Sequence, residues 1–470
     1  MSKIKISDFT VCEGASCLGC ENLTTEMLLP ILEKLDDLGL SAIEAWGGAS
    51  FEHCIATTYE DPWERLKKIG ATLKKTPLQI YFAGQNVLGK QNFPDDTVEF
   101  FIRKAVAAGV SIIRIADPLN DTRNLETSMR VARQLGIRVI AGICYAPSAT
   151  FNNDIFVMYA KQLERMGAHA ISIQDDSGAL SPYDAYQLVK ALRVALAPET
   201  EIHLHTHDCT GMSMQTVLKA AEAGVDVVDT ALSPFAMGMS LPSAEAIVTA
   251  FANTPYSTEL SVEQYRKAGE RASMIRDALL RDGHYSLEML MTDSANAVYQ
   301  IPGGMMKGVL DNLSDARIEN KRLEVFEEVL LIRAEIGNVP LLPPVADIIT
   351  AQAIFNVLST ANDQPRYSML TREFKALVHG EYGRTPTDIK PEFRNKICGS
   401  ADGMIHRPAD RMDPLIEKLR ESIAPYTEEE EDVLTFAMFG QKALDFFEIR
   451  KIHKYKLDAN ADYQNKIHAI

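Results

Sequence analysis

The first half of the chain alternates between short runs of apolar and β-branched residues and longer amphipathic stretches. The amphipathic stretches carry helix signals: Thr24-Thr-Glu-Met opens one over Leu28–Leu38, and Gly39 ends it. Strands that alternate with helices in this way are typical of parallel β/α units. The predicted strands are Lys3–Thr10, Ser41–Trp46, Leu78–Ala83, Ser111–Asp117, Val139–Tyr145, Ala170–Asp175, Glu201–His207 and Val225–Leu232.

This number of units favours a closed barrel over an open sheet. Doubly wound sheets usually stop at about five or six strands, whereas a (β/α)8 barrel needs eight strands and about 250 residues. We therefore predict an α/β fold with a TIM barrel over residues 1–300.

After about residue 300 the pattern changes to helices separated by breaks. Ile301-Pro-Gly-Gly interrupts the chain, Ser314–Ile336 is predicted to form one long charged helix, and Ala346–Ser359 another. The acidic run Glu428–Asp432 suits a helix amino terminus, where the helix dipole favours anions. The sequence thus predicts a mainly helical domain over residues 301–470 that packs on the barrel.

Composition and charge narrow the classes of function. The 470 residues are 46% hydrophobic and 24% charged, which is ordinary for a globular protein with a barrel and a second domain. The net charge of -16 argues against nucleic acid, because nothing neutralises phosphate in bulk. No apolar signal region and no run of about 18 apolar residues occurs, so no transmembrane segment is expected. Seven cysteines in a chain this long do not form a disulfide framework, so we expect a cytoplasmic location.

Candidate chemistry gathers at the ends of the predicted strands. His205-Thr206-His207 ends the seventh strand, and imidazoles at i and i+2 on a strand point to the same face, so both can bind one divalent metal. The carboxyl ends of barrel strands carry the catalytic residues, so the other strand ends supply further candidates. These are Cys12, Glu13, Trp46, Gln85, Asn86, Asp117, Asn120, Asp121, Tyr145, Gln174, Asp175, Asp176 and Ser233.

These residue types can build a metal site. One carboxylate, two imidazoles and an amide or second carboxylate make an octahedral site with positions open to substrate oxygens, where the metal polarises a carbonyl and stabilises an enolate. Cys12, Cys17 and Cys20 follow the first strand and Cys209 follows the histidines. Two interpretations of these cysteines therefore remain open. They could bind zinc as thiolates, or they could be small buried or loop residues without a ligand role.

Longer blocks extend over both halves of the chain. They are Glu44-Ala-Trp-Gly-Gly-Ala-Ser-Phe-Glu, Asp61-Pro-Trp-Glu-Arg-Leu, Gly84-Gln-Asn, Asn120-Asp-Thr-Arg-Asn-Leu-Glu-Thr, Ile202-His-Leu-His-Thr-His, Ile301-Pro-Gly-Gly-Met, Glu381-Tyr-Gly-Arg-Thr-Pro and His406-Arg-Pro-Ala-Asp. Together they resemble the carboxyltransferase component of biotin-dependent enzymes. That family includes the oxaloacetate decarboxylase alpha chain, pyruvate carboxylase, its separate B subunit and the transcarboxylase 5S subunit.

The resemblance implies a divalent metal (zinc, manganese or cobalt) held by Glu13, His205 and His207. It implies a small 2-oxo acid substrate, carboxyl transfer between carboxybiotin and the substrate's enolate carbon, and a homodimer or larger assembly. Biotin carboxylase and biotin carboxyl carrier subunits are the implied partners. The sequence has no Ala-Met-Lys-Met motif and the tail Glu448–Ile470 is too short for a carrier domain, so biotin is expected to arrive in trans.

Several residues depart from the family's pattern. Cys12-Glu13-Gly14-Ala15-Ser16 replaces Arg-Asp-(Gly/Ala)-His-Gln, which keeps a carboxylate but loses the arginine and glutamine near the substrate. Gln174 replaces a lysine that the family carbamylates into a metal ligand, and Ala83 replaces an arginine that binds the substrate carboxylate. Losing an arginine that binds a carboxylate through two hydrogen bonds commonly weakens binding of that carboxylate by several kcal/mol.

Three further positions differ: Lys90 replaces a tyrosine, Glu52 an aspartate, and Lys307 a threonine that shuttles a proton with biotin. The site predicted from this resemblance has two parts besides its metal ligands. The catalytic candidates are Gln174 (as ligand or support for one), Asp176 and Lys307. The substrate-binding candidates are Gln85, Asn86, Lys90 and Cys12.

Three functions remain open from the sequence. The first is a metal-dependent carboxyltransferase subunit that acts with a separate biotin carrier on a 2-oxo acid or related substrate. The second is a biotin-independent, metal-dependent lyase or aldol-type enzyme. The third is a catalytically inactive structural subunit of a carboxylase complex. The presence of the helical half favours the first and third functions. The replacement of the residues that bind the substrate carboxylate in the family favours the second and third.

Overall fold

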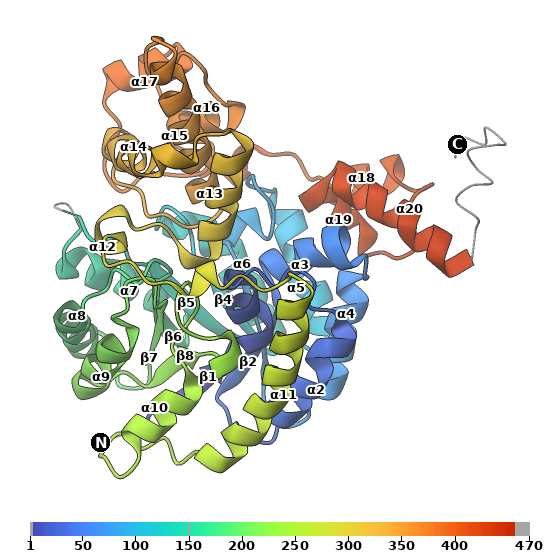
Figure 1. Ribbon diagram of the computed structural model, residues 1–470. Coiled ribbons are helices and arrows are strands. Elements are labelled where there is room, and N and C mark those ends of the chain that lie inside the picture. The colour runs from blue at the N-terminus through green and yellow to red at the C-terminus, as the bar shows by residue number, and fades with distance from the viewer. Residues whose placement is uncertain (1–2, 149–150, 456–470) are drawn as a thin grey trace.

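A closed barrel of eight parallel strands forms the centre of the computed structural model, which describes residues 3–148 and 151–455 (Figure 1). The strands follow one another around the barrel in chain order, and β8 pairs with β1 through Ile6 and Val228 to close it. The predicted TIM barrel is therefore confirmed. The strands are β1 (Lys5–Asp8), β2 (Ala42–Gly47), β3 (Leu78–Phe82), β4 (Ile112–Ile115), β5 (Arg138–Cys144), β6 (Ala170–Asp175), β7 (Glu201–Thr206) and β8 (Val227–Thr230).

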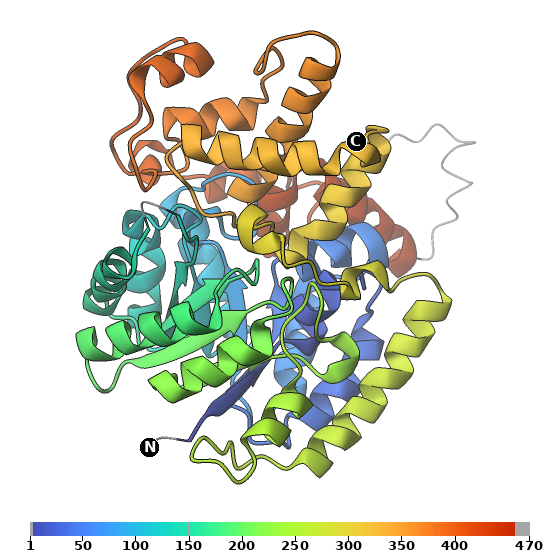
Figure 2. The same cartoon turned by 60° about the vertical axis from the view of Figure 1, so that its left-hand side comes forward.

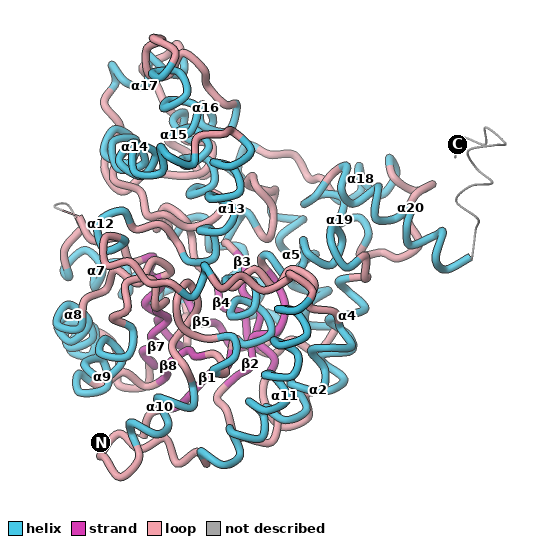
Figure 3. The backbone as a smooth tube through the Cα atoms, in the orientation of Figure 1, coloured by secondary structure: helices cyan, strands magenta, loops and turns pink. Residues whose placement is uncertain are grey.

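Helices surround the strands on the outside, as the tube view shows (Figure 3). Strands covered in this way are buried on both faces, and every residue of β2 and β6 is buried. Thr24 caps the first long helix by accepting a hydrogen bond from the Met27 amide at 3.3 Å. The outer helices are α2 (Thr25–Leu35), α4 (Pro62–Thr72), α5 (Asp95–Ala107), α6 (Glu126–Leu135), α7 (Asn153–Met166), α8 (Pro182–Ala195), α9 (Ser213–Ala223), α10 (Ala244–Phe251) and α11 (Val262–Arg281).

The helices between residues 303 and 398 stand over one end of the barrel (Figures 1 and 2). Most of them share an apolar core of their own, in which Val329, Ile349 and Phe374 are fully buried. The predicted continuous helix Ser314–Ile336 is wrong, because the chain turns through Arg317, whose φ is 57°, between two helices. This group contains α13 (Gly303–Asp315), α14 (Arg322–Glu335), α15 (Val345–Ala361), α16 (Arg372–His379) and α17 (Pro391–Cys398).

The last three helices pack on the barrel instead. They are α18 (Ile416–Ser422), α19 (Asp432–Phe439) and α20 (Gln441–Tyr455), and their apolar side chains join the barrel's core cluster. Trp63 of α4 donates a hydrogen bond from Nε1 to the Thr435 hydroxyl at 3.1 Å. None of the helices in the described part of the chain has the length and hydropathy needed to cross a membrane.

The predicted acidic run Glu428–Asp432 stands at the amino terminus of α19, but only Asp432 lies within the helix and Glu431 precedes it as the N-cap. The helix begins only at Asp432, because the Asp432 carboxylate accepts hydrogen bonds from the amides of Glu428 and Glu429 at 2.8 and 3.0 Å. These bonds hold the preceding residues in a turn. Arg450 of α20 pairs with the same carboxylate at 2.6 Å. The tail Glu448–Ile470 begins within α20, and its residues 456–470 lie outside the described residues.

Candidate active site

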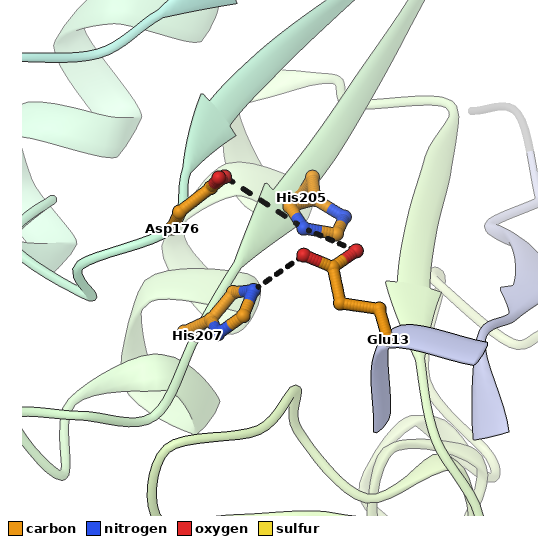
Figure 4. Close-up of side chains that lie close together, drawn as sticks. All are labelled: Glu13, Asp176, His205 and His207. Carbon is orange, nitrogen blue, oxygen red and sulfur yellow. Dashed lines mark hydrogen bonds and ion pairs between the residues drawn. The ribbon is translucent and has the colours of Figure 1, made fainter. Parts of the chain in front are cut away.

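Four side chains from three strand ends meet at the mouth of the barrel (Figure 4). Glu13 lies in a π-helical turn, Thr10–Gly14, directly after β1, and Asp176 follows the last residue of β6. His205 lies in β7 and His207 just beyond it. One ligand atom from each of the four residues lies within 4.8 Å of the other three. We call this group the mouth cluster.

Each histidine of the mouth cluster is oriented through its Nδ1 atom. Nδ1 of His205 lies 3.0 Å from a carboxylate oxygen of Asp229 in β8, and Nδ1 of His207 lies 2.7 Å from the carbonyl oxygen of Met239. Both partners are acceptors, so both Nδ1 atoms carry the proton. A neutral imidazole in this tautomer presents the lone pair of Nε2, which is the arrangement seen in metal-binding histidines.

The Nε2 atoms of both histidines face the carboxylate of Glu13. His205 Nε2 lies 3.3 Å from Glu13 Oε2 and 3.9 Å from Asp176 Oδ1, and His207 Nε2 lies 3.2 Å from Glu13 Oε1. Lone pairs and carboxylate oxygens are all acceptors, so these atoms satisfy one another only when a proton or a metal ion lies between them. His205 Nε2 is buried and has no hydrogen-bond partner among the described residues. The donor set therefore fits a divalent cation with nitrogen and oxygen ligands.

The pKa values of the mouth-cluster residues also show that positive charge is favoured between the histidines and the carboxylates. Burial lowers the pKa of His205, but the charge of Glu13 and the contact with Asp229 outweigh it, and the pKa rises to about 9. Burial raises the pKa of Glu13, yet His205 and His207 together hold it well below its ordinary value. Burial, followed by the charge of Glu13, raises the pKa of Asp176. Without a metal, protons on the histidines neutralise the carboxylates.

A second buried polar group lies beside the mouth cluster, and the sequence analysis missed most of it. Arg114 of β4 donates to Glu44 of β2 from Nε and Nη2, at 2.9 and 2.8 Å, and to the Gln174 side-chain oxygen from Nη1 at 2.8 Å. Gln79 also donates to Glu44, at 2.9 Å. We call these four residues the support network. The arginine within the apolar strand Ile-Ile-Arg-Ile is the signal that could have revealed it.

Arg114 connects the two groups. Its guanidinium lies between the rings of Phe9 and Tyr81, 4.8 and 4.7 Å from their centroids, and Nη2 reaches Glu13 Oε2 at 3.3 Å. Arg114 thus fixes both a mouth-cluster carboxylate and the amide of Gln174. The predicted catalytic residue Gln174 is held through its oxygen, which leaves its amide nitrogen as the group able to act on a ligand.

The other predicted residues lie in different surroundings. Gln85 connects the barrel to the C-terminal region through hydrogen bonds. Its side chain donates to Asp95 at 2.9 Å and accepts from Arg407 at 3.0 Å. Asn86 is buried, Lys90 is exposed, and the Cys12 thiol lies 3.6 Å from the carbonyl oxygen of Gly47. The predicted catalytic Lys307 of α13 pairs with Asp311 at 2.7 Å and with Glu21 at 3.7 Å.

Burial disfavours the thiolate form of the cysteines near the site. The sulfur of Cys17 lies 3.9 Å from Nδ1 of His207, and burial raises the pKa of this thiol to about 11. Burial also raises the pKa values of Cys12, Cys20 and Cys209. The metal-ligand group found in the described part of the chain contains no cysteine. Nitrogen and oxygen ligation therefore describes the site better than zinc–thiolate ligation.

The helical half covers the cluster directly. The amide of Gly303, the first residue of α13, donates to the carbonyl oxygen of Asp176 at 2.8 Å. A Cβ atom at this position would lie 2.7 Å from Nδ1 of His207, so only glycine allows so close an approach.

Comparisons with known proteins match both halves of the chain to described families. Residues 3–270 match the family described as HMGL-like, and residues 297–468 match the Conserved carboxylase domain. The pyruvate carboxylase B subunit of Methanocaldococcus jannaschii is 38% identical over 446 residues, covering 94% of this chain and 77% of the relative. The methylmalonyl-CoA carboxyltransferase 5S subunit of Propionibacterium freudenreichii subsp. shermanii is 32% identical, covering 95% of this chain and 88% of the relative.

Two further similarities complete the picture. The 2-oxoglutarate carboxylase large subunit of Hydrogenobacter thermophilus is 34% identical, covering 96% of this chain and 69% of the relative. The fold matches the carboxyl transferase domain of Rhizobium etli pyruvate carboxylase, solved with pyruvate and biocytin, with a TM-score of 0.89 and 24% identity over 96% of this chain and 78% of that one. The chain therefore belongs to the carboxyltransferase family of biotin-dependent carboxylases.

Proposed function

We propose that the protein is a metal-dependent carboxyltransferase subunit that moves a carboxyl group between carboxybiotin, carried on a separate protein, and a 2-oxo acid. The observation that carries the proposal is the mouth cluster, in which the Nε2 atoms of two buried histidines face the oxygens of two partly buried carboxylates, in a chain of this family. The relatives' names support the substrate class, since they include a pyruvate carboxylase subunit and a 2-oxoglutarate carboxylase subunit.

Glu13, His205 and His207 would hold the metal, with Asp176 as a further ligand. A divalent cation bound there would supply a Lewis acid that polarises the substrate carbonyl. The remaining work falls to the chain itself. Asp229 and Arg114 hold His205 and Glu13 in place, and Gly303 at the start of α13 lies directly against the cluster.

Gln174 would bind substrate rather than metal. Its oxygen accepts the hydrogen bond from Arg114, so its amide nitrogen can donate to a carboxylate or carbonyl oxygen of the 2-oxo acid. This role would replace part of the substrate binding that the family's arginines and glutamine provide. In the carboxylation direction, the N–C bond of carboxybiotin breaks, a new C–C bond forms at the carbon next to the substrate carbonyl, and the proton lost from that carbon passes to biotin.

A transfer assay in the reverse direction tests the proposal. The metal-loaded protein is given oxaloacetate with and without free biocytin, and pyruvate release is measured. We expect release that depends on biocytin, that is lost in Glu13→Gln, and that persists in His203→Gln. His203 lies on the same strand and is also buried, but it pairs with Glu201 outside the cluster. Release that is equal with and without biocytin, or no release at all, would contradict the proposal.

One observation favours a second candidate, an inactive subunit that only assembles a carboxylase complex. The N–H groups of Arg114 already donate to Glu44, Gln174 and Glu13. Lys307 is paired with acidic residues. Neither cation is therefore free to bind an anionic substrate. This candidate predicts no transfer by any variant, together with retained binding to a biotin carrier protein or a biotin carboxylase subunit in a sedimentation experiment.

A further inference from the structure

Tyr81 carries a hydroxyl group to the mouth of the barrel. It lies in β3, two residues after Gln79, which donates a hydrogen bond to Glu44 inside the barrel at 2.9 Å. Alternate residues of a strand face the same side, so Tyr81 also points inward, two residues nearer the carboxyl end of the strand. The centroid of its ring lies 4.7 Å from Cζ of Arg114. The phenol therefore lies at the end of the barrel that holds the mouth cluster.

The hydroxyl oxygen of Tyr81 is buried and has no hydrogen-bond partner among the described residues. The ring packs against a cluster of Ala116, Cys144 and Leu342, none of which carries a strong side-chain acceptor. The Cys144 thiol donates to the carbonyl oxygen of Asp117 at 3.2 Å, so it is directed away from the phenol. Buried hydroxyls without a partner are uncommon, because their loss of hydration is not compensated. A ligand atom that accepts a hydrogen bond would complete this group.

The hydroxyl of Tyr81 is a neutral donor. Burial raises its pKa well above the ordinary value of 10, and the charges of Cys144 and Asp176 raise it further. A protonated phenol can donate one hydrogen bond. A 2-oxo acid at neutral pH presents only acceptor oxygens, in its carbonyl group and its carboxylate. The chemistry of the donor and that of the ligand therefore match.

Arg114 holds a second donor next to the first. Its Nη1 donates to the side-chain oxygen of Gln174 at 2.8 Å, which turns the amide nitrogen of Gln174 towards a ligand. The phenol of Tyr81 lies on the face of the same guanidinium, and Nη2 reaches the Glu13 carboxylate at 3.3 Å. One guanidinium thus holds two neutral donors beside a residue of the mouth cluster.

The cations nearest these donors are already paired. Arg114 is matched by Glu44 at 2.8 Å, and Lys307 by Asp311 at 2.7 Å. The carbonyl oxygen of a bound 2-oxo acid would be the group polarised by a metal in the mouth cluster. The carboxylate of the same ligand then has to be bound by neutral donors.

We propose that Tyr81 is a substrate-binding residue whose hydroxyl donates a hydrogen bond to the carboxylate of the 2-oxo acid, with the Gln174 amide as the second donor. The inference rests on the proposed function and adds a residue to its site. A hydrogen bond to a charged group contributes about 10- to 100-fold in affinity. Tyr81→Phe removes only the oxygen that makes it.

Equilibrium binding of pyruvate tests the inference. Calorimetry measures the affinity of pyruvate for metal-loaded wild type, Tyr81→Phe and Tyr265→Phe. Tyr265 of α11 is the matched control, because its buried hydroxyl also lacks a partner in the described part of the chain. The carboxylates that act on it, Asp8 and Glu245, are not members of the mouth cluster. We expect Tyr81→Phe to bind pyruvate about 10- to 100-fold more weakly than wild type, and Tyr265→Phe to bind it equally well.

Three further measurements separate substrate binding from other roles. The melting temperature of Tyr81→Phe should be no lower than that of wild type, and its metal affinity should be unchanged, because the lost oxygen has no partner without ligand. In the oxaloacetate transfer assay, KM should rise and kcat should stay close to wild type, as expected for a group bound equally in the ground and transition states.

The outcomes distinguish this inference from the proposed function. Unchanged pyruvate affinity in Tyr81→Phe, a parallel loss of metal affinity, or a fall in kcat at constant KM would overturn the role of Tyr81 and leave the proposed function intact. Failure of the metal-loaded wild type to bind pyruvate would overturn both.

Discussion

The mouth cluster and the support network are neighbouring groups of buried and partly buried polar side chains whose bonding requirements are met in opposite ways. In the support network, the charge of Arg114 is matched by Glu44 through two short hydrogen bonds and further spread over Gln174 and Glu13. In the mouth cluster, the Glu13 oxygens face the Nε2 atoms of two imidazoles, which only a proton or a metal ion between them can satisfy, and His205 Nε2 has no hydrogen-bond partner among the described residues.

The difference separates a scaffold from a binding site. A buried charge that is fully paired needs no ligand, and removing one partner destabilises the fold. A set of acceptors that face one another is satisfied only when a proton or a metal ion lies between them, and removing one member chiefly weakens metal binding. Arg114 contacts both groups, so the scaffold also sets the position of Glu13.

The largest effect on folding should come from breaking the support network. Arg114→Met leaves the Glu44 carboxylate buried and unpaired, and we expect a loss of about 3–5 kcal/mol in the free energy of unfolding, measured by urea denaturation. The double variant Arg114→Met, Glu44→Gln should recover a large part of this loss, because no buried charge is left without a partner. Equal stabilities of the single and double variants would contradict the account of this network.

The next largest effect should come from removing a direct ligand. His207→Gln should weaken metal binding by more than about 100-fold, because even changes to outer contacts of a ligand cost about 10- to 100-fold. Competition with a chelator of known affinity measures this value. His203→Gln on the same strand is the matched control and should bind metal as wild type does. Equal affinities of the two variants would remove His207 from the site.

A smaller effect should follow from releasing a ligand's partner. Asp229→Asn keeps the size of the side chain that accepts from His205 but loses its charge, so we expect metal affinity to fall by about 10- to 100-fold. Asp226→Asn is the control, because Asp226 lies just before the same strand and pairs with Arg193 instead. A wild-type affinity in Asp229→Asn would show that this contact does not orient the histidine.

The smallest effect concerns pH. The pKa of His205 in the folded metal-free protein is about 9, above its ordinary value of 6.5, so the proton stabilises the fold fully below pH 6.5 and this stability is lost as pH rises through 9. The melting temperature of the metal-free protein should fall by about 1–3 °C over this window. Calorimetry should show a smaller fall with saturating metal and in His205→Gln. Identical falls in all three samples would contradict the assignment.

The sequence predicted the parts of this molecule that depend on local pattern. The spacing of His205 and His207 at a strand end, with Glu13 after the first strand, led to residues that the fold brings together. Asp229 was missed because the end of the eighth strand directed attention to Ser233. The hydrogen bond from Arg407 to Gln85 joins residues 322 positions apart in the chain, and no local sequence pattern predicts a contact over that separation.

The helical half was harder to predict for a similar reason. Its outline follows from helix periodicity, but the turn at Arg317 interrupts a stretch whose charge pattern continues on both sides. The docking of α18 to α20 on the barrel depends on contacts such as Trp63 with Thr435, which join distant segments. Leu342 entered no prediction, because its packing against Ala116 and Cys144 arises only where the two halves of the chain meet.

The metal content of the purified protein tests the central claim most directly. Elemental analysis is made on the wild type and on a Glu13→Ala, His205→Ala double variant whose fold is checked by circular dichroism. The account predicts about one equivalent of zinc, manganese or cobalt in the wild type and almost none in the folded variant. Absence of metal from both folded proteins, even after incubation with each ion, would contradict the claim that the mouth cluster is a metal site.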